Sequence, residues 1–124
     1  MSHITWVETQ IRDKEILLEV LKKLGYACEE NVWSGSGRGS SPLDVVARKG
    51  RGFQVGFYRR EKEESYMVCY TEDRQAEYKA FQDKVLQAYA REKILKEARR
   101  RNYVLVREQR CEDNRIRLVL RKVA

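Results

Sequence analysis

The hydrophobic residues of this chain repeat with two different periods, and the order of these periods constrains the fold more than any other feature. Residues 4–11 and 43–70 follow the two-residue period of strands, whereas residues 16–24 and 76–101 follow the helical period. Residues 103–121 return to the two-residue period. The sequence therefore predicts one α+β domain over residues 1–124, in which two helices back a single antiparallel, or mixed, sheet of about six to seven strands. The predicted order is β-α-β-β-β-β-α-β-β.

The first helix has a clear signal at each end. Asp13 can cap its N-terminus, because a side-chain oxygen at that position accepts a hydrogen bond from an otherwise unpaired backbone N–H group. Gly25 can adopt the left-handed conformation that ends a helix. Five apolar residues between them share one helical face: Ile16, Leu17, Val20, Leu21 and Leu24.

Three strands are predicted in the middle of the chain, at residues 44–48, 53–59 and 65–70, which are rich in β-branched and aromatic residues. Between residues 26 and 42 the pattern loosens. The aromatic residues are expected to pack in the core or on the sheet, because the aromatic-glycine signature of RNA-binding sheets is absent.

A long helix and a closing hairpin are predicted for the last part of the chain. The helix covers residues 76–101, and its apolar rows shift midway, which predicts a bend or split near Tyr89. Asn102 is expected to end this helix. Strands at residues 103–107 and 115–121 then turn around Asp113 and Asn114. The nearest common topology is the ferredoxin-like split β-α-β arrangement.

The surplus of positive charge lies entirely in the last 34 residues. Up to Ala90, 14 Lys and Arg residues balance 14 Asp and Glu residues; from Arg91 onward, 12 basic residues face 5 acidic ones, which leaves the formal net charge of +7. A chain whose charge is concentrated at one end has a surface suited to phosphates, carboxylates or an acidic protein face.

The candidate binding residues are the arginines of this basic end and one arginine of a glycine-rich loop. In the hairpin, three arginines are expected on one face with Val119, and the apolar residues of the same strand on the other. A solvated sheet face and a helix C-terminus also favour cations without any ligand, so both interpretations stay open. The candidates are Arg99, Arg100, Arg101, Arg115, Arg117, Arg121 and Arg38.

The glycine-rich segment around Arg38 is expected to be a connecting loop. A phosphate-binding loop would need a following Gly-Lys-Ser/Thr and a helix, whereas Pro42 and a predicted strand follow here. Contact of Arg38 with a ligand or partner is the alternative.

The sequence points away from an enzyme and away from cofactor or metal chemistry. His3 is the only histidine, and most acidic residues lie in solvated charge runs, so no general base beside a nucleophile is indicated. Cys28, Cys69 and Cys111 lack metal-ligand spacing and are expected to be reduced structural residues. No segment has the pattern of a membrane span or a secretory signal, so a cytoplasmic location is expected.

Two binding functions remain for the basic end. The favoured one is a non-catalytic accessory protein that docks an acidic protein partner, because the planar fork of arginine pairs with carboxylates through two hydrogen bonds. The alternative is recognition of the RNA backbone, alone or in a ribonucleoprotein. The sequence leaves the oligomeric state open.

Several segments resemble a known family. They are residues 2–5 with 8–13, the Leu24-Gly25-Tyr26 stop, residues 87–90 leading to Ile94 and Ala98, and residues 113–118. Together they are similar to the family of the hypothetical chloroplast reading frame thirty-five, a domain of unknown function in algal plastids, cyanobacteria and other bacteria. The resemblance implies no catalytic residue. It implies a cytoplasmic or stromal housekeeping role, as an accessory to a larger machine such as an AAA-type ATPase assembly.

Overall fold

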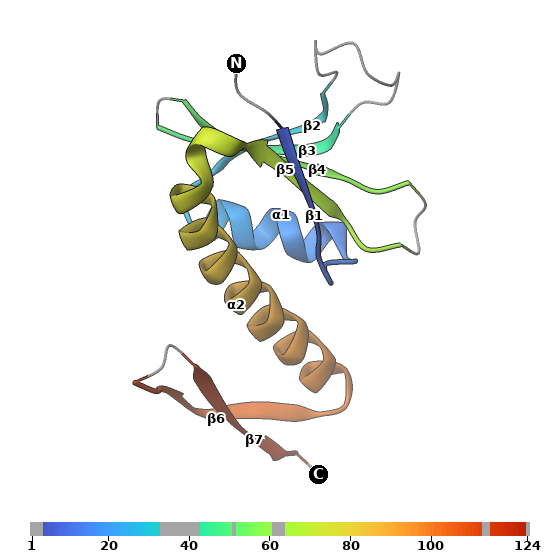
Figure 1. Ribbon diagram of the computed structural model, residues 1–124. Coiled ribbons are helices and arrows are strands. Elements are labelled where there is room, and N and C mark those ends of the chain that lie inside the picture. The colour runs from blue at the N-terminus through green and yellow to red at the C-terminus, as the bar shows by residue number, and fades with distance from the viewer. Residues whose placement is uncertain (1–3, 33–42, 51, 61–63, 113–114, 124) are drawn as a thin grey trace.

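The computed structural model describes residues 4–32, 43–50, 52–60, 64–112 and 115–123 and contains two α-helices and seven strands (Figure 1). The predicted α+β class and the order of elements are confirmed. The elements are β1 (Ile4–Glu8), α1 (Lys14–Lys23), β2 (Ala27–Val32), β3 (Leu43–Lys49), β4 (Phe53–Tyr58), β5 (Met67–Thr71), a short 3-10 helix (Glu72–Arg74), α2 (Gln75–Arg100), β6 (Tyr103–Arg110) and β7 (Ile116–Lys122).

The strands form two antiparallel sheets rather than the single sheet expected from the sequence. Five strands lie in the order β1-β5-β4-β3-β2, and β6 pairs only with β7 among the described residues. The ferredoxin-like prediction is wrong. A split β-α-β unit leaves one strand between the two strands that its helix connects. Here three strands separate β1 from β2, which form the two edges of the sheet.

The ends of α1 are those that the sequence predicts. The Asp13 carboxylate accepts a hydrogen bond from the backbone N–H of Ile16 at 3.1 Å. Gly25 follows the helix with φ of 90°, a conformation that costs glycine little because it has no Cβ. Four apolar residues of the predicted face are buried: Ile16, Leu17, Val20 and Leu21.

The loosened pattern at residues 26–42 includes β2, whose position at the sheet edge explains why the sequence did not place it. Its side chains are mostly exposed, so they show no alternation of apolar and polar residues. Glu29 and Glu30 instead form salt bridges with Arg48 and Lys14.

The core lies between one face of the five-stranded sheet and the two helices. Val7, Val68, Phe57 and Val45 stand side by side across four strands. They pack in one cluster with residues of α1 and α2, among them Phe81. The predicted packing of the strand aromatics is confirmed, since Tyr70 stacks on Tyr78 of α2 with 3.8 Å between ring centroids, and both rings are buried.

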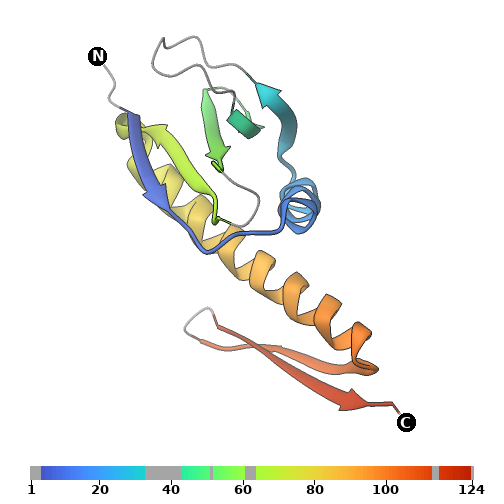
Figure 2. The same ribbon diagram turned by 90° about the vertical axis from the view of Figure 1, so that its right-hand side faces the viewer.

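The helix α2 is continuous over 26 residues and shows no kink in Figures 1 and 2, so the bend or split expected near Tyr89 is wrong. The apolar rows shift because the two halves of the helix have different neighbours. The first half packs on the sheet, whereas the second half extends beyond it and carries the hairpin of β6 and β7 (Figures 1 and 2). Tyr89 lies between the two halves, and its hydroxyl accepts hydrogen bonds from the backbone N–H groups of Arg12 and Asp13.

Asn102 ends α2 as predicted, with φ of 63°. The hairpin that follows is irregular near its start, where Val106 is an extra residue between the pairs Leu105–Leu120 and Arg107–Val119. The predicted turn at Asp113 and Asn114 lies outside the described residues. None of the described residues of β6 and β7 is buried, whereas β3, β4 and β5 of the five-stranded sheet each contain buried residues.

This contrast predicts that the same substitution lowers the free energy of unfolding by different amounts in the two sheets. Val55 of β4 is 0% exposed and Val106 of β6 is 57% exposed. Val55→Ala should lower the free energy of unfolding by about 2–3 kcal/mol through lost burial and a residual cavity. Val106→Ala should change it by less than about 0.5 kcal/mol. Urea unfolding of both variants checks this, and equal losses would contradict the described burial.

Candidate functional site

The pairing of β6 with β7 sorts the hairpin side chains onto two faces. Paired residues of an antiparallel ladder share a face, and alternate residues lie on opposite faces. The face that meets α2 carries Tyr103, Leu105, Glu108 and Arg110 of β6, together with Ile116, Leu118, Leu120 and Lys122 of β7. The opposite face, called the outer face below, carries Arg117, Val119 and Arg121 of β7 beside Gln109, Arg107 and Val104 of β6.

The outer face combines exposed cations with apolar side chains. Arg117 and Arg121 are exposed, and Arg107 of the neighbouring strand adds a third guanidinium. Val104 on the same face is also exposed. Arg115 precedes β7 and is exposed as well. Arg38 and His3 lie outside the described residues.

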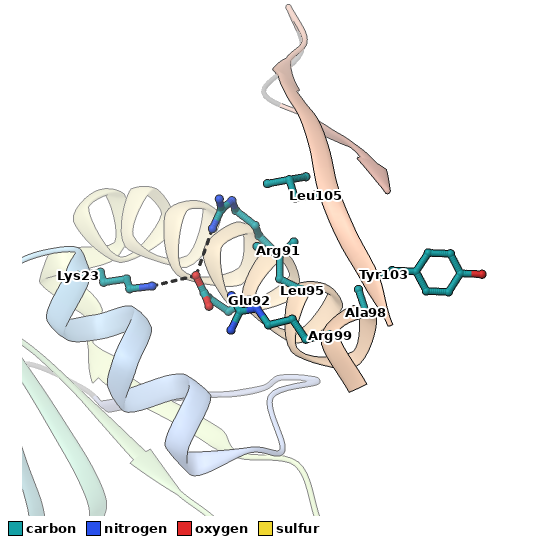
Figure 3. A pocket seen from close by; sticks show the side chains of 8 residues that line it. All are labelled: Lys23, Arg91, Glu92, Leu95, Ala98, Arg99, Tyr103 and Leu105. Atoms are coloured by element: carbon teal, nitrogen blue, oxygen red, sulfur yellow. Dashed lines mark hydrogen bonds and ion pairs between the residues drawn. The ribbon is translucent and has the colours of Figure 1, made fainter. Parts of the chain in front are cut away.

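The predicted triplet at the end of α2 is divided between two sides of that helix. Arg99 lines a hollow of about 320 Å³ beside β6, together with Lys23, Glu92 and other residues (Figure 3). Arg101 lines a groove on the other side of α2, beside Leu120 of β7. Arg100 and Arg101 both form salt bridges with Glu97, at 3.6 and 3.1 Å. The structure therefore does not bring the triplet onto one surface with the hairpin arginines.

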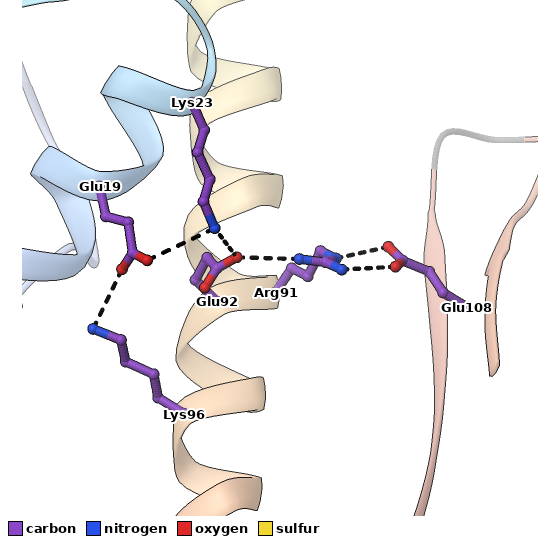
Figure 4. A network of polar contacts seen from close by, with 6 residues as sticks. All are labelled: Glu19, Lys23, Arg91, Glu92, Lys96 and Glu108. Atoms are coloured by element: carbon purple, nitrogen blue, oxygen red, sulfur yellow. Dashed lines mark hydrogen bonds and ion pairs between the residues drawn. The ribbon is translucent and has the colours of Figure 1, made fainter. Parts of the chain in front are cut away.

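A network of ion pairs connects α1, α2 and the hairpin (Figure 4). At its centre is Glu92, which is 5% exposed and whose Oε1 accepts hydrogen bonds from Lys23 Nζ at 3.0 Å and Arg91 Nη1 at 3.1 Å. Arg91 also binds Glu108 of β6 through two parallel hydrogen bonds of 2.7 and 2.8 Å. Glu19 of α1 closes the network with salt bridges to Lys23 and Lys96.

The Arg91–Glu108 pair also changes the acidity of both groups. The hydrogen bond from Arg91 lowers the pKa of Glu108 below its ordinary value of 4.5, and the same bond raises the pKa of Arg91. This pair holds the hairpin against α2 beside the hollow that Leu95, Ala98, Tyr103 and Leu105 line.

Sequence reasoning did not single out the residues of this network. The position of Glu92 in the sequence does indicate burial. Glu92 lies between Tyr89 and Leu95 in the row of buried residues that includes Val85. A charged residue in an apolar row needs a partner to be buried. The partners Lys23 and Glu108 come from other elements, and their spacing in the sequence carries no information about this contact.

The cysteines are free thiols, and all three are half-buried. Burial raises the pKa of Cys28 and of Cys69, which lowers the fraction of reactive thiolate. In the part of the chain that the structure describes, no group of His, Cys, Asp and Glu residues is arranged to hold a metal ion, and no helix has the length and apolarity to cross a membrane.

A family model described as "Protein of unknown function (DUF1257)" matches residues 20–119. The match begins within α1 and ends within β7, so it includes every residue of the ion-pair network except Glu19, and most of the hairpin. Comparison with curated proteins and with solved structures gave no match.

Because Glu92 is buried, removing its charge should lower the free energy of unfolding more than removing the charge of Glu97 on the same helix. Glu92→Gln keeps the shape of the side chain but removes the charge that faces Lys23 and Arg91. We expect the free energy of unfolding to fall by about 1–2 kcal/mol, because hydrogen bonds between charged groups are lost. Glu97→Gln should cost less than about 0.5 kcal/mol, because its salt bridges are exposed. Urea unfolding measures both; equal effects would contradict a central role of Glu92.

The lowered pKa of Glu108 predicts that docking of the hairpin weakens in acid. Because this pKa is lower in the folded state, its contribution is complete above the ordinary value of 4.5 and disappears as the pH falls through the lower value. Hydrogen exchange should show faster opening of β6 and β7 over that range. In the Glu108→Gln variant, β6 and β7 should open to the same extent at all these pH values. The exchange of amides in the central sheet serves as the internal reference.

Proposed function

Since the chain belongs to the DUF1257 family of proteins of unknown function, we propose its function from its own surface: it is a non-catalytic accessory protein that docks an acidic protein partner through the outer face of its hairpin. Within this family we expect it to fall among the proteins that resemble the chloroplast reading frame thirty-five, with an AAA-type ATPase assembly as a suitable partner. We expect its location to be the cytoplasm, or the stroma if it is plastid-encoded.

The proposal rests on the hairpin, because the hairpin does not contribute to the central core. It lies at the far end of α2, apart from the five-stranded sheet, and none of its described residues is buried (Figure 1). A two-stranded hairpin alone in water is marginally stable. A segment of this kind gains stability when another surface covers it.

The composition of the outer face supports a protein partner more than RNA. The guanidinium groups of Arg117 and Arg121 suit carboxylates and phosphates equally. Val104 and Val119 lie among them, and apolar side chains of this kind gain nothing from a phosphate backbone. Arginine combined with apolar residues is typical of protein interfaces.

The surroundings of the polar groups support a role without catalysis. Glu92, the carboxylate that lines the hollow, is held by Lys23 and Arg91, and Glu108 is held by Arg91. The raised pKa values of Cys28 and Cys69 disfavour nucleophilic thiolates.

The remaining candidate arginines have smaller parts in the proposal. Arg99, Arg100, Arg101 and Arg115 extend the positive field around the hairpin, which speeds association with an acidic partner. Contact of Arg38 with a partner stays a prediction.

Affinity capture of the tagged chain from a lysate of its source, with and without nuclease, tests the proposal. We expect a stoichiometric protein partner that survives nuclease and is released by salt. The double variant Arg117→Gln with Arg121→Gln should reduce its retention at least about tenfold, because two charge-assisted contacts are removed. Lys79→Gln with Lys84→Gln makes the same charge change at exposed positions of the first half of α2 and should retain the partner.

Two outcomes would contradict the proposal. Recovery of nucleic acid, or loss of every partner after digestion, would favour the RNA-binding alternative. Equal retention by both double variants would show that the outer face is not the docking surface.

A further inference from the structure

An apolar groove runs beside the hairpin on the side of α2 that faces away from the ion-pair network. It has a volume of about 570 Å³, and its apolar lining comes from Ile94 and Ala98 of α2, Tyr103 of β6 and Leu120 of β7. Ile94 is 48% exposed although its side chain is apolar. Lys93 and Arg101 form the rim, where Glu97 is already bound by Arg100 and Arg101.

The groove lies beside β7, whose second edge is unpaired among the described residues. Tyr103 of β6 lines both this groove and the hollow on the opposite side of α2, but Leu105 of β6 lines only the hollow and Leu120 of β7 lines only the groove, so β7 is the strand on the groove side. Among the described residues β7 pairs with β6 alone. Its second edge therefore presents backbone N–H and C=O groups that can bond an added strand.

A strand added at this edge would meet two different environments on its two faces. Side chains that point toward α2 would enter the groove over Ile94 and beside Leu120. Side chains that point away would lie beside Arg117 and Arg121, because neighbouring strands align their faces. The edge is therefore complementary to a strand in which apolar and acidic residues alternate.

We propose that the partner donates an extended segment of alternating apolar and acidic residues, which pairs with β7 as a third strand and fills the groove with its apolar side chains. This inference rests on the proposed function and specifies how the acidic partner is recognised. A second copy of the chain is a poorer occupant of the same edge, because two paired β7 strands would bring the arginines of both copies onto one face, where like charges repel.

A synthetic peptide of alternating valine and glutamate, labelled with a fluorophore, tests the proposal by anisotropy with the full chain. We expect saturable binding, and no binding when lysine replaces glutamate. Ile94→Lys should weaken binding at least about tenfold. Ile94 is half-exposed, so this variant should keep the fold, which circular dichroism checks. Ala80→Lys adds the same charge at an exposed position in the first half of α2 and should bind as the natural chain does.

Backbone methylation of the peptide separates strand pairing from charge attraction. In an added strand, alternate N–H groups point toward β7 and away from it. Methylation of one alternate set should abolish binding, whereas methylation of the other set should leave it unchanged. Equal effects of the two sets, or an unchanged affinity for Ile94→Lys, would overturn the proposal.

Two further outcomes distinguish this proposal from the proposed function. If the arginine variants lose the captured partner but the natural chain does not bind the peptide, docking to an acidic protein stands and the added strand is wrong. If sedimentation shows a dimer that Ile94→Lys dissociates, and the peptide does not bind, the edge belongs to a second copy and the proposal is overturned.

Discussion

The length of α2 is the constraint on which the rest of the structure depends. A helix of 26 residues is about 39 Å long, whereas strands of five to seven residues are only about 17–23 Å long. The helix can therefore cover the sheet with one half only. The second half must pack against another element, and the only described elements that follow it in the chain are β6 and β7. The division of the molecule into a packed core and a separate hairpin follows from this mismatch.

The contact that holds the hairpin on α2 combines ion pairs with partly buried apolar residues. No described residue of the hairpin is fully buried, but Leu95 and Ala98 of α2 are buried beside Tyr103 and Leu105. The paired hydrogen bonds between Arg91 and Glu108 give the contact its direction, since a guanidinium and a carboxylate must be coplanar to form both. Glu92 holds Arg91 in place from the other side. The hairpin is thus oriented by charge, and its outer face and the edge of β7 are left exposed.

Much of the fold could be predicted because its signals are local. The Asp13 cap, the Gly25 and Asn102 stops and the two faces of β7 depend on residues within a few positions of each other. The edge strand β2 was not placed, since an exposed edge imposes no apolar alternation. The expected break near Tyr89 was wrong, because a change of packing partner along one straight helix produces the same shift of rows as a bend. Of the candidate site, the arginines could be found from charge alone, but the groove beside Ile94 could not.

By itself, the sequence determined the class of the fold, the order of its elements, the ends of its helices and the concentration of positive charge in its last 34 residues. These properties follow from backbone hydrogen bonding, periodicity and composition, which act between near neighbours. Only the tertiary structure decided that the strands form two sheets, that Glu92 is buried between Lys23 and Arg91, and that an apolar groove lies beside the open edge of β7. Each of these depends on contacts between residues far apart in the chain, and the reach of α2 beyond the sheet determines which of those contacts can form.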